Sequence, residues 1–187
     1  MKKKVLLTCA LIASQFVNAQ NSFIKQMYDE QDLTSFFKVE VGFDGISAHS
    51  ENKLGENLLL DTSAGIGGSY EIVDDEFKYA ISSMNAAVFT RLQLRYYINR
   101  HKRLTKGRKL TNNAGTFVAI QTKFSLGKSE NYDQSVMWLN DIHIGQQLPL
   151  GEKFIFRYHI GVGKAFQLTE DLSSFYPAAG VSFGYKF

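Results

Sequence analysis

The sequence predicts an all-β fold, a closed antiparallel up-and-down transmembrane β-barrel of about eight strands. From Phe36 onward, apolar and polar residues alternate with a period of two, the pattern of strands whose two faces meet different surroundings. The less apolar rows are rich in glycine, serine and charges of both signs, which suits the narrow interior of a small barrel. The central positions of the apolar rows carry no Lys, Arg, Asp or Glu, as lipid contact requires, because a mid-bilayer Arg or Lys costs about 2–4 kcal/mol.

The first 19 residues predict a secretory signal peptide. Three lysines at positions 2–4 form a positive start, and residues 5–17 are largely apolar. Small residues then precede Gln20, so we expect cleavage near Ala19 and export to the cell outer membrane. The apolar run is too short for a transmembrane helix, which needs about 20 residues.

The predicted mature chain, residues 20–187, is electrically balanced. Cleavage removes three lysines, which leaves 18 basic and 18 acidic residues in a chain of 168. This balance gives no support to nucleic-acid binding. The single cysteine, Cys9, also lies in the signal, so the exported chain has no disulfide. Because no later window approaches 18 consecutive apolar residues, a helical membrane protein is excluded.

The mature chain divides into a flexible N-terminal lead, residues 20–35, and a barrel domain, residues 36–187. The alternation predicts seven strands, at 37–44, 58–67, 88–99, 118–127, 136–148, 154–165 and 179–187. An eighth strand is expected at Phe77–Ser82, because single-chain bacterial barrels normally have an even number of strands. The alternative is one long loop over residues 71–86 with an extra strand from the lead. His49, Ser50 and Glu51 are expected in a loop.

Aromatic residues are expected to form a girdle at the periplasmic end of the barrel, where a ring suits the boundary between water and lipid. With the N-terminus on the periplasmic side, the strand ranges place seven rings there: Phe37, Tyr70, Phe77, Tyr96, Phe117, Phe154 and Phe187. This placement of the rings favours eight strands, because it puts Tyr70 and Phe77 on either side of one turn between two strands. Lys164, the one charge on the outward rows, is expected near the outer rim, where its cost is small.

The C-terminal octapeptide, residues 180–187, resembles the assembly signal of bacterial outer-membrane β-barrels. Its outward row consists of Val181, Phe183, Tyr185 and the terminal Phe187. The resemblance implies recognition by the barrel assembly machinery, and outer-membrane lipid as the lasting partner of a monomeric barrel. In size the mature chain is similar to the small OmpA/OmpX-type barrels. Residues 95–103 and 112–117 also resemble a group of outer-membrane barrels that is named only for its architecture.

The predicted lumen contains five basic residues, four acidic residues and two histidines. They are Lys38, Glu40, Asp44, Asp61, Arg91, Arg95, Lys123, Asp141, His143, Arg157 and His159. Because buried charges need partners, this near-balance predicts a mutually neutralised network that holds a narrow barrel together. The alternative is a polar pore or a proton-responsive gate, in which His143 and His159 titrate near neutral pH.

A basic turn lies between two predicted strands on the side assigned to the periplasm. It holds six Lys and Arg residues in ten positions: Arg100, Lys102, Arg103, Lys106, Arg108 and Lys109. One hypothesis is attraction to an anionic partner such as lipid phosphate or a cell-wall polymer. The other interpretation is a solvated, flexible turn.

The sequence gives no pattern typical of catalysis, a metal or a cofactor, so we expect a protein that is not an enzyme. His49, Ser50 and Glu51 are immediate neighbours, which is poor geometry for a nucleophile and its base. The four histidines lack metal-ligand spacing. A structural, adhesive or ligand-binding role at the envelope is expected. The alternatives are a pore or transporter for small solutes and a soluble, exported lipocalin-like barrel that binds a hydrophobic ligand.

Overall fold

The computed structural model describes residues 32–80, 86–128 and 135–187. The predicted signal peptide with its cleavage point, and residues 20–31 of the predicted lead, lie outside the described residues. Within the described ranges no helix has the length and apolar character needed to cross a membrane.

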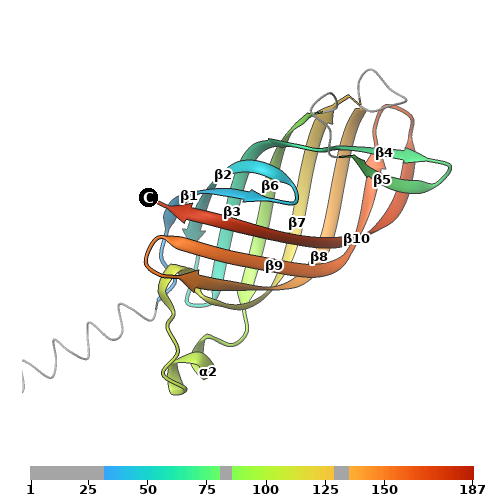
Figure 1. Ribbon diagram of the computed structural model, residues 1–187. Coiled ribbons are helices and arrows are strands. Elements are labelled where there is room, and N and C mark those ends of the chain that lie inside the picture. Colours follow the sequence, from blue (N-terminus) through green and yellow to red (C-terminus); the bar gives the residue numbers. More distant parts are fainter. Residues whose placement is uncertain (1–31, 81–85, 129–134) are drawn as a thin grey trace, which may run out of the picture. The chain divides into compact units, whose positions relative to one another are not determined.

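Eight antiparallel strands close into a barrel (Figure 1). They are β1 (Phe36–Gly42), β2 (Gly45–Lys53), β3 (Leu58–Gly67), β6 (Ala87–Tyr97), β7 (Gly115–Gly127), β8 (Ser135–Leu150), β9 (Phe154–Gln167) and β10 (Leu172–Lys186). Each strand pairs with the barrel strands next to it in sequence, and β1 pairs with β10 to complete the ring, with Lys38 opposite Lys186. The predicted fold class, a closed up-and-down barrel of eight strands, is confirmed.

The predicted position of the eighth strand is wrong, although the count is right. The eighth barrel strand is β2, which contains the residues expected in a loop and places His49 between Lys38 of β1 and Ser63 of β3. Residues 77–80 of the predicted strand instead belong to β5 (Glu76–Ala80), which pairs with β4 (Ser69–Val73) in a separate two-stranded sheet, and residues 81 and 82 lie outside the described residues. The strand β2 was not predicted because its alternation in hydropathy is weak. Its outward row beyond Ile46 consists of Ala48, Ser50 and Asn52.

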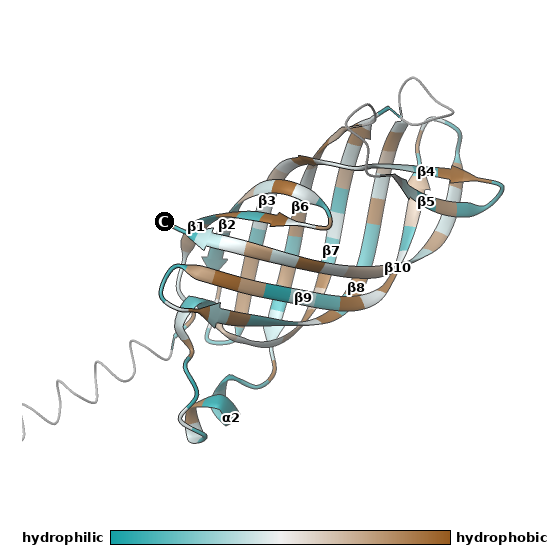
Figure 2. Ribbon diagram, viewed as in Figure 1, coloured by the Kyte–Doolittle hydropathy of each residue, from teal (hydrophilic) through white to brown (hydrophobic). Residues whose placement is uncertain are grey.

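The barrel has an ionic interior and an apolar exterior. Figure 2 shows the hydrophilic and hydrophobic residues along the strands from which these two faces are built. Charged residues of the strands such as Lys38, Arg95 and Asp61 are at most 1% exposed, whereas outward residues such as Ile120 and Phe183 are 63% and 58% exposed. Along the outward rows of the eight strands, as far as the structure describes them, Lys164 is the one charged residue. Such a distribution is the reverse of that in a soluble globular protein.

The end of the barrel where β1 begins and β10 finishes is called the terminal end here. A small apolar cluster closes it from inside, formed by Leu33, Leu59, Tyr97, Phe117 and Ala119. The connection between β6 and β7 adds a short helix, α2 (Arg100–Thr105), and a 3₁₀ turn, η1 (Thr111–Asn113). Asn113 of this turn accepts a hydrogen bond from the backbone N–H of Thr34 at 2.9 Å and donates one to the Thr34 carbonyl at 2.9 Å. The chain segment before β1 is therefore anchored across this end.

The opposite end, called the hairpin end, carries the β4–β5 sheet (Figure 1). The hairpin packs onto inward residues of β8, β9 and β10 in a second apolar cluster, which includes Tyr70, Ile72, Leu139, Tyr176 and Ala178. Hydrogen bonds also fasten the hairpin to β8, β9 and β10. The Ile72 N–H donates to Gln167 at 2.8 Å, Ser135 donates to the Tyr70 carbonyl at 3.1 Å, and Ser174 donates to the Asp75 carbonyl at 2.6 Å.

Four of the seven residues predicted for the aromatic girdle lie together at one end of the barrel, and three do not. Phe37, Tyr96, Phe154 and Phe187 lie at the terminal end and point outward. Tyr70 and Phe77 lie at the hairpin end, because β2 rather than β5 is the barrel strand and the connection from β3 to β6 therefore leaves the opposite rim. Phe117 faces inward and packs edge-on against Tyr97, with ring centroids 5.7 Å apart.

Candidate functional site: the ionic lumen and its capped end

Six side chains in the lumen form a closed ring of alternating charge, called the ionic ring below. In order around the ring they are Lys38, Glu51, Arg95, Asp61, Arg157 and Glu40. Each cation contacts two carboxylates and each carboxylate contacts two cations. The distances include 2.6 Å from Lys38 to Glu51, 2.8 Å from Arg95 to Glu51 and 3.1 Å from Arg157 to Asp61.

The ionic ring joins five strands, because its members come from β1, β2, β3, β6 and β9. Its three positive and three negative charges cancel, and every member is at most 5% exposed. Glu51 also ties the ring to the terminal end, since its second oxygen accepts a hydrogen bond from Asn113 at 2.7 Å. Such complete pairing is what allows charges to remain buried, because an ion left alone in a dry interior is strongly destabilising. The ring therefore fills and cross-links the lumen.

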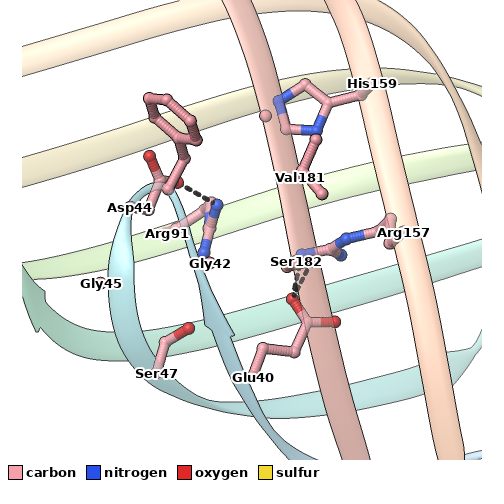
Figure 3. Close-up of a pocket in the computed structure, with 12 residues that line it drawn as sticks. Glu40, Gly42, Asp44, Gly45, Ser47, Arg91, Arg157, His159, Val181 and Ser182 are labelled. Atoms are coloured by element: carbon pink, nitrogen blue, oxygen red, sulfur yellow. Dashed lines mark hydrogen bonds and ion pairs between the residues drawn. The ribbon is translucent and has the colours of Figure 1, made fainter.

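A second ionic group lies near the hairpin end, around the turn between β1 and β2. Arg91 contacts the Asp44 carboxylate at 2.8 Å, and Lys123 contacts the same carboxylate at 3.6 Å (Figure 3 shows the Arg91 contact). Burial raises the pKa of Asp44, but Lys123 and Arg91 outweigh it and lower that pKa from its ordinary 3.8 to about 2. Lys123 also donates a hydrogen bond to the Tyr70 hydroxyl at 2.7 Å, which links the barrel wall to the hairpin.

The third group contains the two predicted lumen histidines. Asp141 lies 2.6 Å from Nδ1 of His143, and it accepts hydrogen bonds from Gln121 and from the Tyr176 hydroxyl, both at 2.8 Å. The imidazoles of His143 and His159 are stacked at a tilt, with centroids 4.4 Å apart. His143 is buried and His159 is partly exposed. All eleven residues predicted for the lumen thus face it or its mouth, in three groups.

Ser47, His49 and Asp61 lie in the order of a nucleophile, a base and an acid. Ser47 Oγ is 2.9 Å from His49 Nε2, and His49 Nδ1 is 2.9 Å from Asp61. The cavity that Ser47 lines measures about 20 Å³, room for one water molecule, so a carbonyl substrate has no space there in this conformation. Figure 3 shows this small cavity, with Glu40 bonded to Arg157 and Ser182 at its base. The three side chains form a buried hydrogen-bonded link between β2 and β3.

The lumen residues that the sequence reasoning missed are mostly those of β2, above all Glu51 and His49. Their signal is the inward row Ser47, His49 and Glu51, which has the same spacing of two as Lys38 and Glu40 on the neighbouring strand. The alternation places Gln93, Gln121 and Gln147 on inward rows, but their part in the polar network was not predicted, because an amide gives no charge pattern. Across the described part of the chain, no group of three His, Cys, Asp or Glu is placed to hold a metal ion.

The basic turn is a packed helical segment rather than a uniformly solvated one. Arg100 and Arg103 are only 4% and 7% exposed, and the Arg103 guanidinium donates to the Lys109 carbonyl at 3.0 Å. Lys102, Lys106, Arg108 and Lys109 are exposed. The predicted assembly signal forms the outward row of β10 and its end, where Val181, Phe183, Tyr185 and Phe187 are all exposed.

A scan of protein-family models and searches of curated proteins and of solved structures give no match to this chain.

Proposed function

We propose that this chain is an integral β-barrel of a bacterial outer membrane with a closed lumen, and that it acts in the envelope as a structural and ligand-binding element. One observation carries the proposal, the continuous apolar exterior of the barrel. Large side chains such as Phe37, Ile160 and Val162 are 65–68% exposed, and they belong to outward rows with one charged residue along the described strands. Exposure of such an apolar surface to water costs free energy, whereas contact with the hydrocarbon of a membrane does not. Closure of the sheet also pairs the backbone hydrogen-bonding groups at every strand edge, as hydrocarbon requires.

The closed lumen favours this role over that of a pore or transporter. The ionic ring fills the middle, Leu33 and Phe117 pack at the terminal end, and the β4–β5 hairpin covers the other end. Of the two lumen histidines, His143 is only 2% exposed and His159 is partly exposed at the hairpin end. A soluble lipocalin-like barrel would instead turn its apolar rows inward around a hydrophobic ligand. Here the inward rows are ionic, which speaks against that alternative.

Membrane insertion is tested with two arginine substitutions at exposed apolar positions, one in the middle of a strand and one in a turn at the rim of the barrel. Ile120 points outward from the middle of β7 and is 63% exposed, and Leu54 lies in the β2–β3 turn and is 55% exposed. If hydrocarbon surrounds the strands, Ile120→Arg costs about 2–4 kcal/mol and Leu54→Arg about 0–1 kcal/mol. In water both exposed positions would tolerate arginine equally.

The measurement is the amount of folded protein in outer-membrane fractions, read from the shift in electrophoretic mobility between unboiled and boiled samples. We expect wild type and Leu54→Arg to give the shift and Ile120→Arg to give much less folded protein. Equal behaviour of the two variants, or recovery of the unmodified chain as a soluble protein without detergent, contradicts the proposal.

A further inference from the structure

A partly open cavity of about 290 Å³ lies at the hairpin end, between the β4–β5 sheet and the mouth of the barrel. It is about fourteen times larger than the cavity beside Ser47 and is near the lower limit for small-molecule sites. Its walls come from the hairpin, from the β1–β2 turn and from the inward rows of β7, β8, β9 and β10. Parts of the chain that are far apart in sequence therefore contribute to one site.

One wall of the cavity is a continuous stack of four aromatic rings. Tyr79 stacks on Tyr70 with centroids 4.9 Å apart, Tyr70 on Phe77 at 5.6 Å, and Phe77 on Tyr176 at 4.7 Å. The wall is held in place, because the Tyr79 hydroxyl donates to the Phe43 carbonyl at 2.5 Å and the Tyr176 hydroxyl donates to Asp141. Because Tyr70 and Phe77 are each stacked with two neighbouring rings, the wall meets a ligand through the outer rings, Tyr79 and Tyr176, and through ring edges, and it needs no ordering at binding.

The facing wall is polar and presents both hydrogen-bond donors and acceptors. Asp44 has 35% of its side chain exposed, and the amide of Gln121 and the ammonium of Lys123 line the same space. Among the residues that the structure describes, the imidazole of His159 has no hydrogen-bond partner, although it stacks on His143. A bound molecule can therefore both donate to and accept from this wall.

The charges around the cavity select against ions. Asp44 and Asp141 would repel an anion, and their charges are matched by Arg91 and Lys123, which leaves no net charge to attract either sign. An organic cation would also meet Lys123, whose ammonium already lies over the rings of Tyr70 at 4.8 Å and Phe89 at 4.1 Å. The Lys123 ammonium would therefore repel a second cation from this side of the cavity.

A purely apolar ring fits the cavity no better. It would displace water from Asp44 and His159 without replacing the hydrogen bonds, and an unsatisfied buried polar group costs about 1–3 kcal/mol. A neutral ring with several hydroxyl groups meets both walls at once, because its C–H face lies on the aromatic stack and its hydroxyls pair with the polar side. We propose that this cavity binds a single neutral sugar unit. This inference rests on the proposed function in one respect: in an outer-membrane barrel whose hairpin end faces the cell exterior, the cavity would be open to sugars outside the cell.

The test measures binding to the full mature chain, folded in detergent, by isothermal titration calorimetry. The probes are glucose, galactose and N-acetylglucosamine as neutral sugars, with indole, tetramethylammonium and benzoate as the apolar, cationic and anionic comparisons. We expect saturable binding of at least one sugar, with the three comparison probes about tenfold weaker or more. Tighter binding of indole or of either ion assigns the cavity to another ligand class and overturns the inference.

Three variants locate the binding. Phe77→Ala removes the centre of the aromatic wall, and Ala178→Leu fills the cavity from β10, so each should weaken sugar binding about tenfold. Phe175→Ala is the matched control, because Phe175 is on β10 at the same end but points outward, with 78% exposure. Sugar binding that survives both cavity variants contradicts the inference.

Each sample is also checked for its mobility shift on boiling. An intact shift without sugar binding rejects this inference alone, whereas a missing shift in the wild type rejects the proposed function.

Discussion

Lys38 on β1 donates a hydrogen bond to Glu51 on β2 at 2.6 Å, and neither side chain is exposed to solvent. The contact joins a residue predicted to face the lumen with one expected in a loop. It also forms one link of the ionic ring, so the loss of either partner leaves an uncompensated charge in the interior.

Substitution of Glu51 should therefore be among the most damaging single changes in the lumen. We expect Glu51→Ala to cost about 3–5 kcal/mol, because Lys38 and Arg95 each lose one of their carboxylates in a buried site. Glu56→Ala in the exposed β2–β3 turn is the control and should stay within about 0.5 kcal/mol of wild type. Urea unfolding of detergent-folded protein gives both values. Equal stability of the two variants would mean that the ring does not support the barrel.

Removal of the hairpin should leave the barrel intact. The strands β4 and β5 pair only with each other in the described structure, whereas β3 and β6 pair directly through ten residue pairs from Leu58–Tyr96 to Gly67–Ala87. Replacement of residues 69–80 by a short Gly-Ser linker should therefore retain the mobility shift on boiling.

Because the ionic ring still fills the lumen, neither this variant nor wild type should conduct ions in planar bilayers. Stable channels in wild type would instead support the pore interpretation.

Close approach of neighbouring strands leaves no room for a side chain at Gly161 in the lumen. A methyl group on Gly161 would lie 2.1 Å from the Ile142 carbonyl oxygen and 2.5 Å from Cβ of His143. Gly161→Ala should thus force the backbone to shift, with a cost of about 1–3 kcal/mol. Gly55 in the β2–β3 turn has open space around it, apart from Leu58 at 3.8 Å, and Gly55→Ala should be neutral or slightly stabilising. A comparison of unfolding midpoints checks the difference, and a tolerated Gly161→Ala would contradict the crowding.

Acid should weaken the attachment of the β1–β2 turn. The pKa of Asp44 is lowered from its ordinary 3.8 to about 2 in the folded protein, so its contribution to stability is present above about pH 4 and is lost as the pH falls toward 2. Asp44→Asn removes this titration. We expect the variant to be less stable than wild type at pH 6 and to lose less stability between pH 4 and pH 2. Parallel pH profiles for the two proteins would show that Asp44 is not stabilised by Arg91 and Lys123.

Much of the fold was predictable because the direction of a side chain depends on its place along its own strand. The period of two assigns Lys38, Arg95 and Asp141 to the inward rows without any knowledge of their partners. The alternation is weak in β2 and strong in β5, so the eighth barrel strand was predicted at β5 instead of β2. Alternation reports the contrast between the two faces of a strand, and it does not show to which sheet the strand belongs.

The sequence by itself determined that the chain is all-β, where seven of the eight barrel strands lie, and which residues of those strands face inward, because these follow from local backbone geometry. Only the tertiary structure decided that Glu51 completes the ring with Lys38, Arg95, Asp61, Arg157 and Glu40, and that the hairpin covers a cavity with an aromatic wall. Those features depend on which strands become neighbours and in what register, and contacts between residues as distant as Glu40 and Arg157 arise only when the barrel closes.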